Sequence, residues 1–281
     1  MRVILLGPGK LPDVLREAER LRPLIEQHAR IALADFTGQA DLSAVEADAA
    51  IVLGGDGSIL WAARQMGHRQ LPVIAVNLGR LGFLADLAPD ELAGLLENHA
   101  IDDLPVVEHL MFRCQVTRGD EVLAERIGLN EVAVQAGPPF AMLTVDLYVD
   151  SELVTTYSCD GLIVSTPVGS TAHSLSAGGP ILRKDLQAFV ISPISPHTLT
   201  NRPVVDSADR VYEMVVADAR DQTPVILDGR VLSMVVPGDR VRVERADVQF
   251  RLVTAPGHSY YRTLREKLGW GGRIRKDRPP A

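Results

Sequence analysis

The 281-residue sequence contains little cysteine, few histidines and no long hydrophobic run. Its two cysteines, Cys114 and Cys159, lie far apart and have no histidine nearby at metal-ligand spacing, which argues against a disulfide scaffold and a structural zinc site. None of the seven histidines is paired with another one helical turn away, so a histidine metal site has little support. We therefore expect reduced, structural thiols and assign no protein residue as a metal ligand.

An excess of positive charge is also missing. The net charge of -7 and the pI near 5.5 argue against a sequence-blind nucleic-acid binder, because such proteins need a basic surface to displace phosphate counterions. No apolar run approaches the roughly 20 residues that span a bilayer, and the apolar start of the chain is too short for the core of a signal peptide. We expect a cytoplasmic protein with a small-molecule partner, no nucleic acid and no membrane.

The first hundred residues alternate short apolar runs with segments of helical periodicity. The runs expected to form strands buried on both faces lie at 3–6, 31–34, 49–53 and 73–76. The buried face of a first helix is predicted to carry Leu11, Val14, Leu15, Ala18, Leu21 and Ile25. A further helix is predicted to begin at Pro89, with proline and acidic residues in its first turn. The alternation predicts an α/β domain with a parallel sheet, which we place at residues 1–104.

The second half of the sequence is predicted to be β-rich. Phe112, Cys114 and Val116 alternate with polar neighbours, as do the residues of 143–149, and the dipeptides Asp150-Ser151 and Asp228-Gly229 are typical of turns. A sandwich-like domain at 105–258 fits best. Residues 259–281 are predicted to form a helix at 260–268 that ends at Gly269, followed by a basic, poorly ordered tail at 273–281.

The sharpest local signal is a glycine turn, Gly54-Gly55-Asp56-Gly57-Ser58, between a predicted strand and a predicted helix. Gly54, Gly55 and Gly57 would let backbone N–H groups approach phosphate oxygens, and Ser58 is the expected N-cap of the helix. The spacing is neither GxxxxGK(S/T) nor GxGxxG. Asp56 could accept a proton from an attacking hydroxyl or hold magnesium, but a turn aspartate without a chemical role is equally well supported at this point.

Two further signals contain polar residues next to predicted strands. The segment 160–180 places a predicted strand before a turn dense in hydroxyls and a short helix, where Ser170 and Thr171 could face a polar nucleotide. A flexible serine-glycine linker is disfavoured there because apolar residues anchor both sides. Asn130 and Glu131 precede the strand at 132–134, but such a pair alone is more often a solvated turn.

In this order and spacing, the segments 54–58, 130–131 and 160–180 resemble the NAD kinase family. Residues 77–84, 228–229 and 264–270 also look like that family, so the resemblance covers nearly the whole chain. It implies a two-domain fold with the active site between the domains and the final helix packed back on the first domain. It further implies a phosphotransferase that uses ATP or polyphosphate and Mg²⁺ to phosphorylate the 2′-hydroxyl of the adenosine ribose of NAD, giving NADP, as a homodimer or homotetramer.

The resemblance also implies roles for particular residues. Asp56 would be the catalytic carboxylate and, with Gly57, would contact the ribose hydroxyl. Gly54, Gly55, Gly57 and Ser58 would bind the donor phosphates. The dinucleotide would be held by Asn130, Glu131 and Asp160, in a pocket lined by Thr171, Ala172, His173, Ser174, Leu175 and Ser176. The positions that depart from the family pattern are Ser58, Ser158, Val168 and His173, the last standing where tyrosine is usual.

Two alternatives are weighed against this interpretation. A lipid or sphingoid-base kinase also uses a Gly-Gly-Asp-Gly turn, but its loop usually continues differently, and no exposed amphipathic membrane helix is apparent here. A dinucleotide-binding sensor without catalysis is the second alternative, and the presence of Asp56 argues against it. The sequence leaves open whether the donor is ATP or polyphosphate and whether NADH is accepted.

Overall fold

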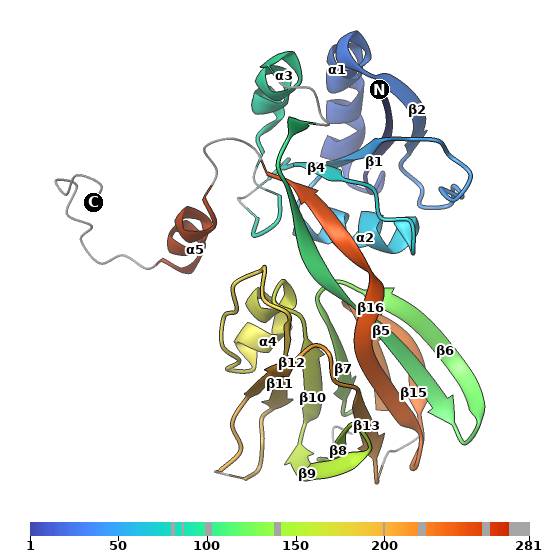
Figure 1. Ribbon diagram of the computed structural model, residues 1–281, viewed down its shortest axis with the longest axis vertical. Helices are drawn as coiled ribbons and strands as arrows, with labels where there is room; N and C mark the ends of the chain where they lie inside the picture. The colour runs from blue at the N-terminus through green and yellow to red at the C-terminus, as the bar shows by residue number, and fades with distance from the viewer. Residues whose placement is uncertain are drawn as a thin grey trace, which may run out of the picture. The chain divides into compact units, whose positions relative to one another are not determined.

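The computed structural model describes residues 1–79, 82–85, 87–98, 103–137, 142–198, 200–218, 223–254 and 259–269. The expected basic tail at 273–281 lies outside these residues. The chain divides into two compact units (Figure 1). The first unit comprises 1–62, 72–106 and 252–281, and the second comprises 63–71 and 107–251.

The first unit is an α/β unit on parallel strands, as predicted. Its strands lie side by side in the order β2-β1-β3-β4, and every pair is parallel. The strands are β1 (Arg2–Leu6), β2 (Arg30–Asp35), β3 (Ala49–Leu53) and β4 (Val73–Val76). The helices that alternate with them are α1 (Pro12–His28), α2 (Asp56–Met66) and α3 (Pro89–Asn98). β3 and β4 are buried along their whole length, which explains their continuous apolar sequences.

Two predictions for this unit are wrong in detail. β2 is not buried on both faces, because it is the edge strand of the sheet and pairs only with β1 among the described strands. Leu11 and Leu15 do not lie on the buried face of α1, since their exposed fractions are 48% and 43%. The buried face consists of Val14, Ala18, Leu21 and Ile25, spaced three or four residues apart.

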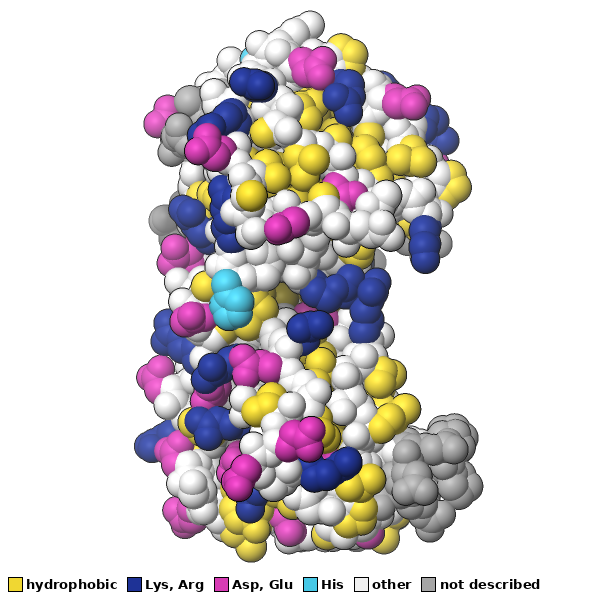
Figure 2. Space-filling view, turned by 90° about the vertical axis from the view of Figure 1, so that its right-hand side faces the viewer, with side chains coloured by type: hydrophobic (Ala, Val, Ile, Leu, Met, Phe, Trp, Pro, Cys, Tyr) yellow, Lys and Arg dark blue, Asp and Glu magenta, His cyan; other side chains and the backbone are white. Residues whose placement is uncertain are grey.

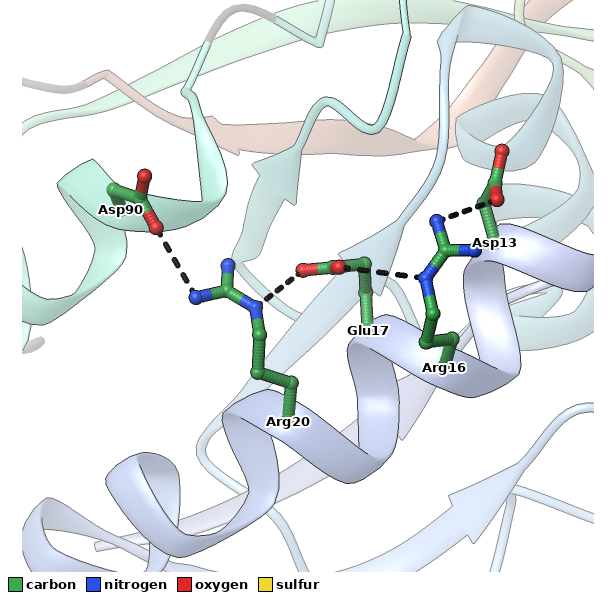
Figure 3. Close-up of polar contacts among 5 residues, drawn as sticks. All are labelled: Asp13, Arg16, Glu17, Arg20 and Asp90. Atoms are coloured by element: carbon green, nitrogen blue, oxygen red, sulfur yellow. Dashed lines mark hydrogen bonds and ion pairs between the residues drawn. The ribbon is translucent and has the colours of Figure 1, made fainter.

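Charged side chains hold the outer surface of the two helices α1 and α3 together. Figure 3 shows Arg20 of α1 between Glu17 of the same helix and Asp90 of α3, with Nη1 of Arg20 3.1 Å from Oδ1 of Asp90. Exposed pairs of this kind contribute at most about 1 kcal/mol each. Acidic and basic side chains are interspersed over the face of the molecule in Figure 2.

The second unit is antiparallel, and two sets of strands share one apolar core. One set is a six-stranded sheet in the order β12-β11-β10-β7-β14-β15. Its strands are β7 (Glu131–Gln135), β10 (Gly161–Ser165), β11 (Ala188–Ile194), β12 (Val204–Ser207), β14 (Thr223–Leu227) and β15 (Arg230–Val235). The other set comprises β5 (Val106–Arg118), β6 (Glu121–Gly128), β8 (Leu143–Val149), β9 (Glu152–Cys159), β13 (Tyr212–Val216) and β16 (Arg240–Val253). Buried residues of both sets, among them Phe112, Val134, Val164 and Tyr212, form one cluster, which agrees with the expected sandwich.

The predicted turns of the second unit have the conformation that their residues favour. Asp150 and Ser151 join β8 to β9 with φ of 49° and 71°, and Asp228 and Gly229 join β14 to β15 with φ of 46° and 76°. Two successive left-handed residues form the hairpin turn that matches the twist of the strands. Aspartate tolerates this conformation better than most residues, and glycine adopts it freely.

The last described helix, α5 (Tyr260–Leu268), belongs to the first unit, in agreement with the expectation for the final helix. Gly269 ends it with φ of 60°, and the ammonium group of Lys267 lies 5.3 Å from the centre of the Phe83 ring. None of the described helices is both long and apolar enough to cross a membrane.

Both cysteines are free and buried, as expected. Burial raises the pKa of the Cys114 thiol to about 12 and that of the Cys159 thiol to about 11. Since the thiolate is the reactive form, both thiols are structural.

Candidate functional site

The glycine turn begins where β3 ends, and each of its glycines has a different environment. Gly54 has φ of 131°, and a Cβ on it would lie 2.0 Å from the Ser58 hydroxyl oxygen. Its N–H donates to the carbonyl of Val76 at 2.9 Å, so this donor is already used within the sheet. Gly55 and Gly57 face open space, since no described atom lies within 4 Å of where their Cβ would be. The room for phosphate is therefore at Gly55 and Gly57.

Ser58 is not the N-cap of α2, contrary to prediction. The helix begins at Asp56, and the N–H of Ser58 donates to the carbonyl of Gly55 at 2.8 Å. Ser58 is therefore inside the first turn, where it is buried beside Gly54. The helix starts earlier than the capping rule indicated because Gly55 occupies the N-cap position, which glycine also tolerates.

The Asp56 carboxylate is bound by a loop distant in the sequence. Its Oδ2 accepts the N–H of Phe83 at 2.7 Å, and its Oδ1 accepts the N–H groups of Leu84 and Ala85 at 2.9 and 3.0 Å. A Cβ on Gly82 would lie 2.2 Å from Oδ1, so only glycine allows the loop to approach the carboxylate this closely. This clasp of three successive amides fixes both oxygens of Asp56.

The clasp leaves Asp56 with a defined free position. An ionised carboxylate offers about four lone-pair positions, two on each oxygen. Oδ1 already accepts two hydrogen bonds and Oδ2 accepts one, so the remaining position is on Oδ2. Asp56 is half-buried and its neighbour Gly57 is exposed, so a donor from solvent can reach this oxygen.

In the second unit, Asn130 and Glu131 lie at the start of β7, against the hydroxyl-rich turn (residues 165–171). The Thr166 N–H and hydroxyl donate to the carbonyls of Asn130 and Leu129, at 2.9 and 2.6 Å. A Cβ on Gly169 would lie 2.1 Å from the carbonyl oxygen of Asn130, so the turn packs directly on this backbone. Two signals separated by more than thirty residues in the sequence are thus brought together.

Glu131 is buried, and one oxygen of its carboxyl group accepts no hydrogen bond from the described residues. Burial, followed by the nearby charge of Asp228, raises the pKa of Glu131 to about 8. The backbone N–H of His173 donates to this carboxyl group. Within the part of the chain that the structure describes, Oε2 of Glu131 is buried without a hydrogen-bond partner. A neutral carboxyl group at this position can donate a hydrogen bond to a ligand oxygen.

The segment 171–176 is divided between exposed and buried side chains. It forms the end of a 3₁₀ turn, η2 (Gly169–Thr171), and the short helix α4 (His173–Ser176). Thr171, Ala172, His173 and Leu175 are partly exposed, and Ser176 is exposed. Ser174 is fully buried, and its hydroxyl lies 3.0 Å from that of Ser192.

Ser170 does not face a ligand, contrary to prediction. It is fully buried; its hydroxyl donates to the carbonyl of Pro167 at 2.6 Å and accepts the N–H of Leu182 at 3.0 Å. The hydroxyl of Thr171 donates to the carbonyl of Val168 at 3.1 Å. The hydroxyls of the turn therefore stabilise its own backbone, as serine and threonine often do in turns.

Asp160 and Glu131 lie at opposite ends of a pair of antiparallel strands. In the register of β7 and β10, Ser165 is opposite Glu131 and Gly161 is opposite Gln135, so Asp160 follows at the far end. His173 lies along β7 between these ends, with its N–H on Glu131 and its Nδ1 3.5 Å from the Gln135 side chain. The polar groups thus form an elongated surface rather than a compact cluster.

His197, which the sequence did not single out, and Asp228, expected only as a turn residue, contact these polar groups. His197 Nε2 lies 3.3 Å from Oδ1 of the half-exposed Asp160. The carboxylate of Asp228 accepts the N–H groups of Leu129, Asn130 and Glu131. The sequence signals for the missed groups were weak: a glycine at 82 and a turn dipeptide at 228–229.

An acidic side chain fixed beside open glycines, at the carboxyl end of a parallel strand, is suited to aligning a hydroxyl with a phosphoryl donor. Phosphoryl transfer depends mainly on such positioning and on neutralising charge. An elongated polar surface is suited to a long, multifunctional ligand. The fold and the site together are those of a phosphotransferase that acts on a nucleotide.

Comparison with known proteins identifies the family within this class. The family model of the ATP-NAD kinase N-terminal domain matches residues 23–103, and that of the ATP-NAD kinase C-terminal domain matches residues 129–255. The NAD kinase of Rhodopirellula baltica is 55% identical over 274 residues, covering 97% of this chain and 88% of the relative. The chain belongs to the NAD kinase family.

Solved structures agree with this assignment. The NAD kinase from Archaeoglobus fulgidus in complex with ATP is similar with a TM-score of 0.77 and 27% identity, covering 97% of this chain and all of that chain. Yeast NADH kinase complexed with NADH has a TM-score of 0.83 at 22% identity, covering 99% of this chain and 90% of that chain. The second comparison shows the likeness of the fold alone.

Proposed function

We propose that this chain transfers the γ-phosphoryl group of ATP to the 2′-hydroxyl of the adenosine ribose of NAD. The observation that carries the proposal is the clasp on Asp56, which holds a reachable carboxylate oxygen next to the open glycines of α2. Relatives that carry the name NAD kinase, and a solved NAD kinase structure with ATP, support the identity of the two substrates.

Asp56 is the group that orients and deprotonates the attacking hydroxyl. Its Oδ2 accepts the ribose O–H, and the proton moves to the carboxylate as the O–P bond forms and the bond from the γ-phosphorus to ADP breaks. Gly55 and Gly57 bind the donor phosphates through N–H groups of the first turn of α2, where the helix dipole favours anions. Gly54 and Ser58 pack against each other and stabilise this turn.

The dinucleotide binds through side chains of the second unit. Asn130, Glu131 and Asp160 hydrogen-bond its ribose and amide groups, and the exposed members of 171–176 line its pocket. Glu131, with its unused buried oxygen, gains a partner when the ligand binds. Satisfying a buried polar atom is worth more than adding a hydrogen bond at an exposed surface.

The divalent metal is best treated as part of the nucleotide substrate. Among the described residues, no three His, Cys, Asp or Glu side chains gather into a metal site, and three of the lone-pair positions of Asp56 are taken. Mg²⁺ retains several waters and binds readily to triphosphate oxygens. We propose MgATP as the donor complex, and a cytoplasmic homodimer or homotetramer as the working form of the enzyme.

The proposal is tested by assaying NADP or NADPH formation from NAD or NADH with either MgATP or polyphosphate. Wild-type protein should convert NAD with MgATP, and the other combinations define its donor and acceptor range. Asp56→Asn should lower kcat by about 100-fold or more, because the amide cannot take the proton, while calorimetry still detects NAD binding.

Asp13→Asn is the matched control, because Asp13 is also a first-turn aspartate of a helix in the first unit. Its exposed carboxylate pairs with the exposed Arg16 of the same helix at 2.6 Å, so turnover should not change. Near-normal turnover of Asp56→Asn would contradict the catalytic role, and absence of NAD turnover by the wild type would contradict the function.

A further inference from the structure

The turn between β14 and β15 directs a carboxylate at the start of β7. Asp228 accepts the N–H groups of Leu129 and Asn130 at 2.8 Å each and that of Glu131 at 3.1 Å. Its own N–H donates to the carbonyl of Glu131 at 3.0 Å. Four hydrogen bonds therefore join one turn residue to three successive residues nearly a hundred positions away.

Two of these residues, Leu129 and Asn130, are also held by the hydroxyl-rich turn. Thr166 donates to the carbonyls of Leu129 and Asn130, and the Ser165 hydroxyl donates to the carbonyl of Asn130 at 3.3 Å. The three amides and the Glu131 carbonyl thus bind Asp228, and the carbonyls of Leu129 and Asn130 bind the turn. The segment links β6 to β7, and its backbone has no freedom to turn the side chains of Asn130 and Glu131 elsewhere.

Asp228 is also the charge that acts most on Glu131. Its carboxyl group is surrounded by protein, and its charge is the second cause, after burial, of the raised pKa of Glu131. Arg64, in the last turn of α2, is the cation whose charge acts on Asp228. Burial raises the pKa of Asp228, and its hydrogen bonds with the three amides, together with the charge of Arg64, oppose that rise.

We propose that Asp228 is a positioning residue of the dinucleotide site, which orients Asn130 and Glu131 toward NAD. The inference rests on the proposed function, in which those two side chains bind the dinucleotide. Asp228 does not touch the ligand in this scheme. It acts through the backbone of the segment 129–131.

Asp228→Asn is the variant that tests this role. Asparagine keeps the volume and adopts the left-handed turn as readily as aspartate, but its amide nitrogen cannot accept, so at least one of the three N–H groups loses its acceptor. The Michaelis constant for NAD should rise about tenfold, which corresponds to about 1.4 kcal/mol, or roughly one hydrogen bond. We expect the Michaelis constant for ATP to change by less than about twofold and kcat to fall less than the constant for NAD rises.

Asp150→Asn is the matched control. Asp150 occupies the same position in the β8–β9 turn, with φ of 49°, and its carboxylate accepts the N–H of Val211 at 3.0 Å. Its N–H donates to the carbonyl of Val211 at 2.9 Å. The two variants therefore disturb comparable turns, and Asp150→Asn should leave both Michaelis constants unchanged while thermal unfolding reports any general loss of stability.

A double-mutant cycle with Asn130→Ala separates the inference from the function on which it rests. If Asp228 acts through this segment, the double variant should bind NAD only slightly more weakly than Asn130→Ala alone. Wild-type turnover of NAD together with an unchanged Michaelis constant for NAD in Asp228→Asn would overturn the inference alone. Failure of the wild type to use NAD would overturn the function.

Thr166→Val provides a second route should Asp228→Asn not fold. It removes the hydroxyl donor on the opposite side of the same segment and leaves the Thr166 backbone in place. The Michaelis constant for NAD should rise with that for ATP unchanged. An unaltered constant for NAD, or an equal rise for both substrates, would overturn the positioning of this segment.

Discussion

The buried carboxyl group of Glu131 should make the free energy of unfolding depend on pH, and Glu131→Gln should remove that dependence. Its pKa is raised from 4.5 to about 8, chiefly by burial. A difference of about 3.5 pH units corresponds to about 5 kcal/mol at roughly 1.4 kcal/mol per unit, and this is the full cost of ionising the group in the folded protein. Glu131→Gln keeps the shape of the side chain but cannot ionise.

The direction of the effect follows from proton binding. Between about pH 4.5 and pH 8 the folded protein keeps a proton on Glu131 that the unfolded chain releases. The free energy of unfolding therefore falls as pH rises, by up to about 1.4 kcal/mol per pH unit. The contribution of Glu131 is fully present below pH 4.5 and is lost as pH rises through about 8.

The assay is urea unfolding of the wild type and Glu131→Gln at pH 5.5 and pH 7.5, followed by circular dichroism. Over these two pH units the variant should gain about 3 kcal/mol relative to the wild type. Glu152→Gln, which changes an exposed glutamate of β9, should show the same pH dependence as the wild type. A difference between Glu131→Gln and the wild type that is equal at both pH values would refute the reasoning.

Two further predictions concern the clasp and the proposed pocket. Gly82→Ala should lower turnover, because its Cβ would lie 2.2 Å from Oδ1 of Asp56. Gly79→Ala is the control and should not lower turnover, because the position of its Cβ is open. Equal turnover of the two variants in a steady-state assay would contradict the need for glycine beside Asp56. His173→Tyr should preserve or tighten NAD binding because it keeps a ring, and His173→Ala should weaken it. Calorimetric affinities that are the same in the wild type and both variants would show that the His173 side chain does not touch NAD.

The fold could be predicted where one strand or helix carries its own signal. Strands β3 and β4 are uninterrupted apolar runs because both faces are covered, and the two Asp-containing turns have the left-handed residues that such hairpins need. The errors lie at residues whose burial depends on how the strand or helix packs against the rest of the unit. β2 has an apolar sequence but lies at the sheet edge, and Leu15 follows Val14 by one residue, which places it about 100° around α1 from the buried face.

The candidate site could be predicted in its residues but not in their surroundings. Asp56 is a candidate because strand ends and glycine turns are local features, whereas Asn130 and Glu131 become candidates through the resemblance to the NAD kinase family. The amides that bind Asp56 come from 27 to 29 positions away, and those that bind Asp228 come from 97 to 99 positions away. No local pattern shows that two backbone segments will meet a carboxylate. Ser170 was misassigned for the same reason, since its partner Leu182 lies beyond the turn.

Asp56 and Asp228 share one arrangement of hydrogen bonds and differ in the role that we propose for each. Each carboxylate accepts three successive backbone N–H groups, and such a concave row of amides is a natural anion site. They differ in their surroundings: Asp56 begins a helix beside the open positions of Gly55 and Gly57, whereas Asp228 lies in a hairpin turn near the charges of Glu131 and Arg64 and is proposed to act through the backbone of 129–131. The same substitution should therefore have opposite kinetic effects: asparagine at position 56 lowers kcat with NAD binding retained, and asparagine at position 228 raises the Michaelis constant for NAD with most of kcat retained. If both variants changed kcat and the Michaelis constant for NAD in the same way, the two carboxylates would have the same role. Proton transfer by Asp56 and positioning by Asp228 would then both be contradicted.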